Sequence, residues 1–405
     1  MTELVIHAGQ VFTAAEGEPL AHDAWVRVED DRIVEVTSSE PRSAPGSRRV
    51  EAPDATLLPG LIDCHVHFAM SGGPDWLSEM QEPYALSCWR AALHARKTLE
   101  AGFTTVRTLG GRPGADPALR DAQVAGIVVG PRVVATNLAI CMTGGHGAWI
   151  GREADGPDDV RKAVREQLKA GADCIKLIAT GGVMTPGVQP GSQQLSDDEL
   201  RAGVDEAHKA GRRVAAHAHG ADGIKAAVLA GVDSIEHGSF MTDEILSLMR
   251  ERRTFYSATL CSAQGFLDAP PNTVADWAMI KAGQVRVALD ASFRHAYHAG
   301  VRLVLGTDAG TPFNRHGENA RELALMVKLG VDPLDALRAG TRNGAELLGK
   351  LDLIGSLEAG KAADLVLVAG DVVADINRLC NPANIQLVVQ AGRIVHRSGE
   401  FSDVS

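Results

Sequence analysis

The segment Leu58-Pro59-Gly60-Leu61-Ile62-Asp63-Cys64-His65-Val66-His67 places two histidines two residues apart, directly after an apolar run. On a β-strand, residues i and i+2 point to the same face, so both imidazoles can reach one metal ion. The neighbouring Cys64 points to the opposite face, where we expect it to pack. The segment therefore predicts a strand whose end carries His65 and His67 as metal ligands.

A second segment, Leu305-Gly306-Thr307-Asp308-Ala309-Gly310, puts a carboxylate just after the apolar run 301–305. Asp308 in this position can ligate a metal ion, hold the hydrolytic water and accept its proton. The alternative is an N-cap for the following helix. We favour the catalytic and metal-ligating role because the chain offers matching histidines elsewhere.

Lys176 lies inside the apolar run Cys174-Ile175-Lys176-Leu177-Ile178. A buried ammonium group must be paired or lose its charge. One possibility is a lysine paired with a core carboxylate. The other is a carbamate formed with CO₂, whose two oxygens could bridge two metal ions. We favour the carbamate because of the surrounding histidines.

Two further histidines follow short apolar runs. His217 lies in Val214-Ala215-Ala216-His217-Ala218-His219-Gly220, and His237 lies in Ser234-Ile235-Glu236-His237-Gly238. His219 would share the face of His217, so either could be the ligand. We choose His217 as the ligand because it is closer to the strand, and we assign His219 to the substrate.

The rest of the chain alternates short apolar runs with longer amphipathic stretches, which predicts an α/β fold with a parallel sheet. Eight strand candidates between about 57 and 307 predict a closed (β/α)8 TIM barrel, with the active site at the carboxyl ends of its strands. Ser196 and Glu199 form a capping-box pattern for a helix running toward Gly211. Both chain ends read as short strands. We therefore expect a barrel over 57–354 and a small β-sandwich domain from 1–56 and 355–405.

Composition narrows the possible partners. The 405 residues carry 40 basic and 51 acidic side chains, a net charge of −11 with no basic patch, which argues against nucleic acid. No apolar run is long enough for a membrane span. The six cysteines are scattered without a C-x-x-C pair, and the N-terminus lacks the pattern of a secretory signal. We expect a cytoplasmic homo-oligomer with a small-molecule substrate.

Candidate substrate contacts come from loops. Gly144-Gly145-His146-Gly147 is rich in glycine, but no lysine follows as a phosphate-binding P-loop requires. Asn314-Arg315-His316-Gly317-Glu318 follows Asp308. We expect His146, Arg315 and His316 to contact substrate together with His219.

These motifs together resemble the metal-dependent amidohydrolase superfamily over nearly the whole chain. The tail 354–365, Ile-Gly-Ser-Leu-Glu-Ala-Gly-Lys-Ala-Ala-Asp-Leu, is similar as well. Thr143-Gly144-Gly145-His146-Gly147, Thr180-Gly181-Gly182-Val183 and His217-Ala218-His219-Gly220 resemble the imidazolonepropionase-like group that contains Xaa-Pro dipeptidases and metal-dependent carboxypeptidases. Imidazolonepropionases themselves and the deaminases lack the bridging lysine, so Lys176 favours two metals and hydrolysis of an amide-like bond.

The resemblance implies a ligand set. His65, His67 and Asp308 would hold one metal, His217 and His237 the second, and carbamylated Lys176 would bridge them. Two divalent ions are implied, with Zn²⁺ expected and Mn²⁺ or Co²⁺ as alternatives. Asp308 would pass a proton from water to the leaving nitrogen.

Three functions follow from these residues. The first is a dipeptidase or carboxypeptidase acting on dipeptides or N-acyl amino acids, whose carboxylate Arg315 could bind. The second is an amidohydrolase of aryl amides, ureas or carbamates, favoured by Trp76, Trp89, Trp149 and the apolar loop 266–271. The third is a metal-binding homologue without turnover, against which the complete ligand set argues.

Overall fold

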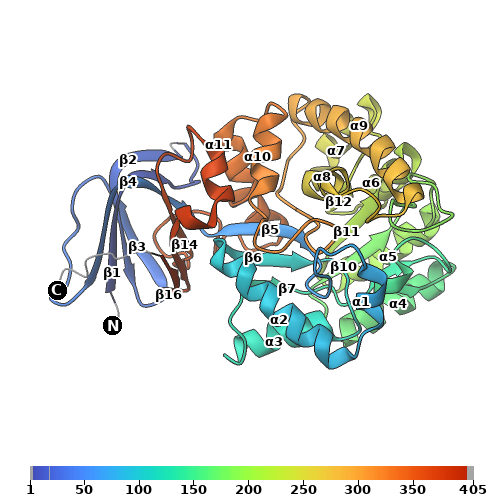
Figure 1. The fold of residues 1–405 in the computed structure, drawn as a ribbon, viewed down its shortest axis with the longest axis horizontal. Helices are drawn as coiled ribbons and strands as arrows, with labels where there is room; N and C mark the ends of the chain where they lie inside the picture. The colour runs from blue at the N-terminus through green and yellow to red at the C-terminus, as the bar shows by residue number, and fades with distance from the viewer. Residues whose placement is uncertain (1–2, 18, 399–405) are drawn as a thin grey trace.

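A computed structural model describes residues 3–17 and 19–398 of the chain. A seven-stranded sheet lies at one end, on the left in Figure 1, and helices surround two parallel sheets at the other. The seven-stranded sheet has the order β16-β15-β14-β4-β1-β2-β3. Its strands are β1 (Glu3–Phe12), β2 (Leu20–Glu29), β3 (Arg32–Thr37), β4 (Arg48–Pro59), β14 (Leu365–Ala369), β15 (Ile385–Gln390) and β16 (Arg393–Arg397).

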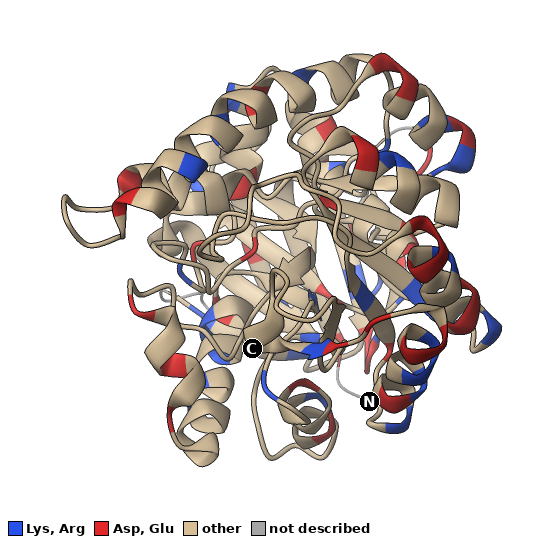
Figure 2. Cartoon of the chain, turned by 90° about the vertical axis from the view of Figure 1, so that its right-hand side faces the viewer, with Lys and Arg blue, Asp and Glu red and all other residues tan. Residues whose placement is uncertain are grey.

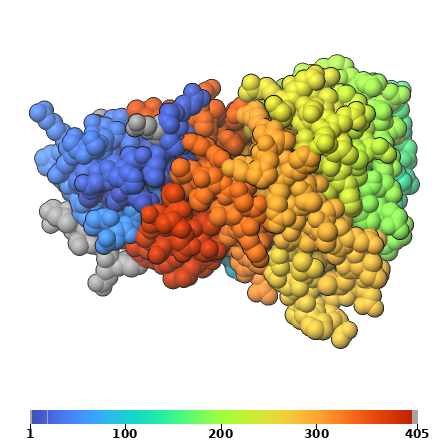
Figure 3. Space-filling model, turned by 90° about the horizontal axis from the view of Figure 1, so that it is seen from above, coloured from blue at the N-terminus to red at the C-terminus, as the bar shows by residue number. Residues whose placement is uncertain are grey.

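The two ends of the chain meet in this sheet. β4 pairs in parallel with β1 and antiparallel with β14, so that Leu57 lies opposite Leu367. The space-filling view shows the same neighbourhood, with blue N-terminal and red C-terminal residues in contact (Figure 3). The hydrogen-bonded order is continuous, so a sandwich of two facing sheets stays a prediction. The domain boundaries at 56 and 355 also stay predictions, and their outer ends, residues 1 and 405, lie outside the described residues.

The parallel sheets carry the strands expected from the apolar runs. One has the order β5-β6-β7 and the other β13-β12-β11-β10-β8-β9. Their strands are β5 (Leu61–Val66), β6 (Phe103–Thr108), β7 (Arg132–Val134), β8 (Ala139–Cys141), β9 (Gly151–Glu153), β10 (Cys174–Ile178), β11 (Arg213–Ala218), β12 (Ser234–His237) and β13 (Phe255–Ser257). Every pairing in them is parallel, which confirms the predicted α/β arrangement.

Helices separate the strands. They are α1 (Trp76–Gln81), α2 (Tyr84–Glu100), α3 (Ala115–Val124), α4 (Pro157–Lys169), α5 (Asp197–Lys209), α6 (Ala221–Ala230), α7 (Asp243–Arg252), α8 (Leu260–Asp268), α9 (Asp276–His298), α10 (Arg321–Lys328), α11 (Pro333–Ala339), α12 (Arg342–Leu347), and the short 3₁₀ turns η1 (Ala148–Ile150), η2 (Ile376–Cys380) and η3 (Pro382–Asn384). The predicted capping box is present at α5, where Ser196 and Glu199 satisfy each other's backbone N–H.

The run 301–305, expected as the last strand, forms no regular strand. It makes a single bridge between Leu303 and Tyr256, and Leu305 accepts a hydrogen bond from Cys64 N at 2.9 Å. Beyond this run Asp308 has φ 60°, a left-handed value, and the next residue, Ala309, bridges Val66 of β5. The segment nevertheless lies between β13 and β5. On the other side, Ala135 O accepts from Asp173 N at 2.6 Å and links the two parallel sheets.

Charge is distributed unevenly over the molecule. Most Lys, Arg, Asp and Glu residues lie on the helices around the rim, and the centre is largely uncharged (Figure 2). No described helix combines the length and apolarity needed to cross a bilayer. The buried exceptions inside the parallel strands are Asp63, Arg107, Lys176 and Glu236, each at most 2 % exposed. Because burying a charge is costly without a partner, these four residues point to a functional centre.

Candidate active site

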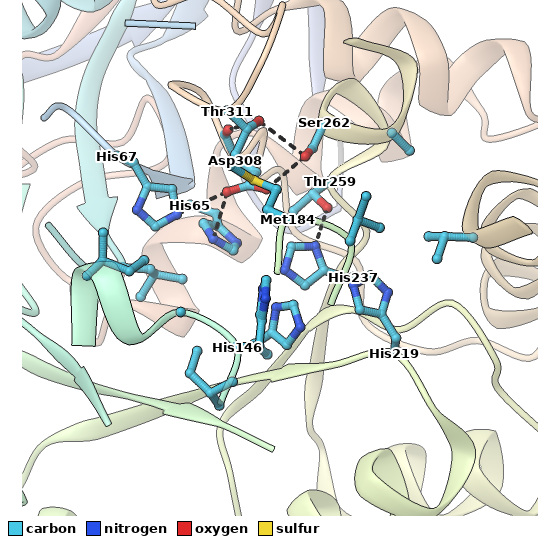
Figure 4. A pocket seen from close by; sticks show the side chains of 18 of the residues that line it. His65, His67, His146, Met184, His219, His237, Thr259, Ser262, Asp308 and Thr311 are labelled. Atoms are coloured by element: carbon cyan, nitrogen blue, oxygen red, sulfur yellow. Dashed lines mark hydrogen bonds and ion pairs between the residues drawn. The ribbon is translucent and has the colours of Figure 1, made fainter. Parts of the chain in front are cut away.

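A cavity opens where the parallel strands end. It combines a few convergent polar groups with an apolar lining, which is typical of a site for a small molecule. Its inner part carries titratable side chains, several of which converge in Figure 4. These are His65, His67, His146, Lys176, His217, His219, His237 and Asp308. The predicted metal ligands therefore all line one cavity, although they come from five separate places in the chain.

The first candidate metal-binding group is His65, His67 and Asp308, whose ligand atoms lie within 4.8 Å of one another. Asp308 Oδ1 lies 3.3 Å from Nε2 of His65 and 3.0 Å from Nε2 of His67. All three side chains are buried. His65 lies at the end of β5 and His67 directly after it. Asp308 is held beside them by its backbone N–H, which donates to His65 O at 2.8 Å.

The other ring nitrogens decide what this group can bind. Nδ1 of His65 lies 2.9 Å from a Glu236 oxygen, and Nδ1 of His67 lies 2.7 Å from Gly110 O. A carboxylate and a carbonyl only accept, so each Nδ1 must donate. Both Nε2 atoms then present lone pairs toward Asp308 Oδ1. Three converging acceptors fit a cation, as in carboxylate–histidine–metal arrangements.

Glu236 is kept ionised in spite of its burial. Burial raises the pKa of the Glu236 carboxyl, but Arg107, which donates to it at 2.8 Å, outweighs that effect together with His65 and Lys176, and the pKa lies well below its usual range. Burial lowers the pKa of His65 to about 4. At neutral pH the pair is therefore a carboxylate and a neutral imidazole, the protonation states that metal ligation requires.

The second candidate group is His217, His219 and His237, also with ligand atoms within 4.8 Å of one another. Nδ1 of His219 is 2.8 Å from Ser239 Oγ, and Nδ1 of His237 is 2.7 Å from Thr259 Oγ1. Nε2 of His217 is buried without a hydrogen-bond partner. His219 is thus a member of this group together with the two predicted ligands, His217 and His237.

Lys176 faces the same cavity from β10. Its Nζ is buried and has no hydrogen-bond partner, a costly arrangement for an ammonium group. Burial lowers the pKa of Lys176 to about 8. A share of the side chain is then the neutral amine, the form that reacts with CO₂. The orphaned nitrogen, next to two groups of metal-ligating side chains, fits the predicted carbamate.

Asp308 is held at both of its oxygens. Ser262 Oγ donates to Oδ2 at 2.8 Å, while Oδ1 faces the two histidines. Burial raises the pKa of Asp308, but His65 and His67 outweigh it and bring the pKa to about 2. The left-handed backbone of Asp308 and His237, with φ 60° and 72°, is strain of a kind that gathers at functional sites.

The predicted substrate contacts divide into two pairs. His146 and His219 line the cavity. Arg315 is exposed and does not line it. His316 is buried, stacks on His94 with ring centroids 4.5 Å apart, and has Nε2 3.0 Å from Met70 O. His316 Nε2 also lies 3.3 Å from His67 O, so this residue supports the backbone of a site residue. Neither Arg315 nor His316 lines the cavity.

Several site residues were not anticipated from the sequence. Asp63 accepts from the backbone N–H of His65 and from Thr307 Oγ1 at 2.6 Å, which ties β5 to the Asp308 segment. Glu236 and Arg107 orient His65, and Ser262 orients Asp308. Glu236 is an acidic residue inside a strand of only four residues. That position is the sequence signal that could have predicted its buried pairing with Arg107. Ser262 offers no comparable signal.

The comparisons with known proteins agree with this geometry. The model of the Amidohydrolase family matches residues 56–395. The chain belongs to this family. Ochratoxinase from Aspergillus niger is 32 % identical, over 98 % of this chain and 87 % of that protein. The amidohydrolase fold and a hydrolase acting on C–N bonds are thereby established for the chain.

Solved amidohydrolase structures superpose closely. A crystal structure of a Xaa-Pro dipeptidase with methionine bound in its active site has a TM-score of 0.88 and 34 % identity, covering 97 % of this chain and 99 % of that one. A prolidase in complex with N-methylphosphonate-L-proline has a TM-score of 0.91 and 32 % identity, covering 98 % and 100 %. The predicted kinship with Xaa-Pro dipeptidase-like amidohydrolases is confirmed.

Proposed function

We propose that the chain is a binuclear metal-dependent amidohydrolase that cleaves dipeptides or N-acyl amino acids at the C-terminal residue. The observation that carries this proposal is the orphaned Nζ of Lys176 beside two groups of metal-ligating side chains. His65, His67 and Asp308 would hold one ion, His217 and His237 the other, and carbamylated Lys176 would bridge them. Zn²⁺ suits an imidazole-rich site, with Mn²⁺ or Co²⁺ as alternatives.

Two divalent ions supply Lewis acidity and lower the pKa of water. The chain's own residues do the rest. Asp308 accepts the proton of the attacking water and returns it to the leaving nitrogen. Ser262, which donates to Oδ2, keeps that carboxylate in one orientation. His146 and His219 offer ring nitrogens to the substrate carboxylate.

A second function is supported by the outer cavity wall. The apolar lining and the position of Arg315 outside the cavity would also suit an aryl amide, urea or carbamate. The similarity to ochratoxinase, alongside the similarity to prolidases, leaves both substrate classes as candidates.

The proposal extends to the architecture. The bonds at Ala135 and Leu305 are the contacts that would close the two parallel sheets into one (β/α)8 barrel over 57–354. The seven-stranded sheet would then be the β-sandwich domain of the chain ends. A cytoplasmic location and a homo-oligomer remain predictions from the sequence.

The test is a library of dipeptides and N-acyl amino acids, each with its C-terminal amide, together with aryl ureas and carbamates, screened on metal-loaded enzyme. We expect hydrolysis of the free acids, with kcat/KM falling at least about tenfold on amidation, since a lost charge-assisted hydrogen bond weakens binding by that order. Unchanged kcat/KM on amidation, or turnover of ureas and carbamates alone, would favour the second function. Two bound metals without any turnover would identify a non-catalytic homologue.

A further inference from the structure

Away from the histidines, the cavity is walled by apolar side chains that come from separate segments. η1 contributes Trp149, the loop between β10 and α5 contributes Val183 and Met184, α8 contributes Phe266, and α9 contributes Val285 and Leu289. Apart from Lys176, no described Lys or Arg lines the cavity. A charged substrate side chain placed against this wall would lose its hydration without gaining a partner.

The apolar wall is packed rather than loosely covered. Met184 is only 8 % exposed and belongs to one buried cluster with Phe266 and Ala282. Trp149 and Val183 pack against the same cluster. Segment 183–188, which carries Met184 and is called the roof loop below, therefore covers the cavity. Apolar contacts join it to α8 and α9. Met184 and Asp308 both line the cavity (Figure 4).

Lys281, a buried residue of α9, connects this helix to the roof loop through hydrogen bonds. Lys281 Nζ donates to Thr185 O at 2.8 Å and to Val188 O, two carbonyls of the roof loop. Lys281 is 9 % exposed, and its Nζ lies 5.0 Å from the centre of the Trp277 ring. Burial lowers its pKa. Burying a lysine without a counter-charge is costly, so its hydrogen bonds to the loop must offset that cost.

The roof loop is also fastened from the inner side. Thr185 Oγ1 lies 2.7 Å from Nδ1 of His146, which lines the cavity. The same ring packs against Gly182, where a Cβ atom would lie 2.4 Å from Nε2 of His146. Residues 183–188 are thus held between Lys281 on one side and His146 on the other.

We propose that segment 183–188, positioned by Lys281, closes an apolar subsite that takes a bulky aliphatic or aromatic side chain of the amide substrate. This rests on the proposed amidohydrolase function and specifies its substrate. Lys281 is a positioning residue, because it contacts the roof loop and not the reacting atoms. Burial of a leucine or phenylalanine side chain should favour such substrates roughly 10–100-fold over glycine analogues.

The first measurement compares substrates on the wild-type, metal-loaded enzyme. The panel is Gly-Gly, Gly-Leu, Leu-Gly, Gly-Phe, Phe-Gly, Gly-Asp and Asp-Gly, with binding of N-acetyl-leucine and N-acetyl-glycine followed by calorimetry. We expect at least tenfold higher kcat/KM for one apolar series and tighter binding of N-acetyl-leucine. If no dipeptide is hydrolysed but N-acetyl-leucine still binds more tightly than N-acetyl-glycine, only the proposed hydrolysis is overturned. Turnover or binding without apolar preference would overturn the subsite.

The second measurement tests the fastening. Lys281→Met removes both hydrogen bonds to the loop, and Lys281→Arg keeps donors in place. The matched control is Lys225→Met on α6, where the lysine is half-exposed and paired with Glu244. We expect Lys281→Met to raise KM for the apolar substrate about tenfold with kcat for Gly-Gly unchanged, and Lys281→Arg to restore much of it. Met184→Ala should lower the apolar preference without touching the hydrogen bonds. A folded Lys281→Met with wild-type KM values would reject the fastening, and Met184→Ala with wild-type preference would reject the subsite.

Discussion

Glu236 accepts a hydrogen bond from Nδ1 of His65 at 2.9 Å, although the two residues are 171 positions apart. Arg107 donates to the second oxygen of the same carboxylate at 2.8 Å. The arrangement fixes the imidazole tautomer so that Nε2 faces the cavity. It explains why a fully buried ion pair lies directly beneath the candidate metal site: the pair orients a ligand and does not merely fill the core.

Replacing Glu236 by Gln should weaken metal binding. The amide keeps the shape of the carboxylate but can present a donor to His65, which permits the wrong tautomer. We expect affinity for Zn²⁺ to fall about 10–100-fold, the usual effect of losing such a partner. Titration against a chelator measures it, with the exposed Glu244→Gln as control. Equal affinities in the two variants would contradict the orienting role.

Lys176→Ala should lose bound metal and activity together, because the bridging oxygens would be gone. Metal content per chain and hydrolysis are the two measurements, and ¹³C-labelled CO₂ should give a carbamate signal in the wild type only. Short carboxylates added to the variant should restore part of the activity. Full activity with two metals in Lys176→Ala would reject the bridging role.

Asp308→Asn should lower kcat by about 10²–10⁴-fold, the usual contribution of a general acid–base group. Ser262→Ala removes the hydrogen bond to Oδ2 and should lower kcat by roughly tenfold, since hydrogen bonds to charged groups contribute that much. Steady-state kinetics at matched metal content separates the two effects. A loss under tenfold in Asp308→Asn, with both metals retained, would place the base elsewhere.

His94 should make stability depend on pH. Burial lowers its pKa from 6.5 to about 4, and Nδ1 lies 2.9 Å from Phe68 O. The folded state therefore binds fewer protons than the unfolded state below pH 6.5. Its stabilising contribution is complete above the unfolded pKa and is lost as pH falls toward 4. Between pH 7 and pH 5 the loss from this group amounts to about 2 kcal/mol.

His94→Asn keeps a donor near the Nδ1 position but cannot take up the proton. We expect it to lose about 2 kcal/mol less free energy of unfolding than the wild type between pH 7 and pH 5. Denaturant titrations at the two pH values measure the difference, with His298→Asn on the exposed side of α9 as control. Identical pH dependence in His94→Asn and the wild type would refute the assignment.

Local chemistry alone pointed to most of the inner site. His65 and His67 could be predicted as a pair because strand alternation depends only on neighbouring residues. Lys176 could be predicted as a functional residue because burying an ammonium group inside an apolar run is costly in any fold. The parallel α/β arrangement followed for the same reason, since apolar runs of strand length repeat along the chain. Each of these inferences uses only neighbours in sequence.

Long-range packing decided the remainder. The exposure of Arg315, the pairing of Glu236 with His65, and the fastening of the roof loop by Lys281 depend on contacts between residues far apart in the chain. The run 301–305 makes a single bridge, to Tyr256, where a regular strand was expected. No local pattern carries this information, because the partner of a buried polar group is chosen by tertiary structure. The sequence by itself thus determined the family and predicted the candidate ligands, and the fold decided how these side chains are oriented and covered.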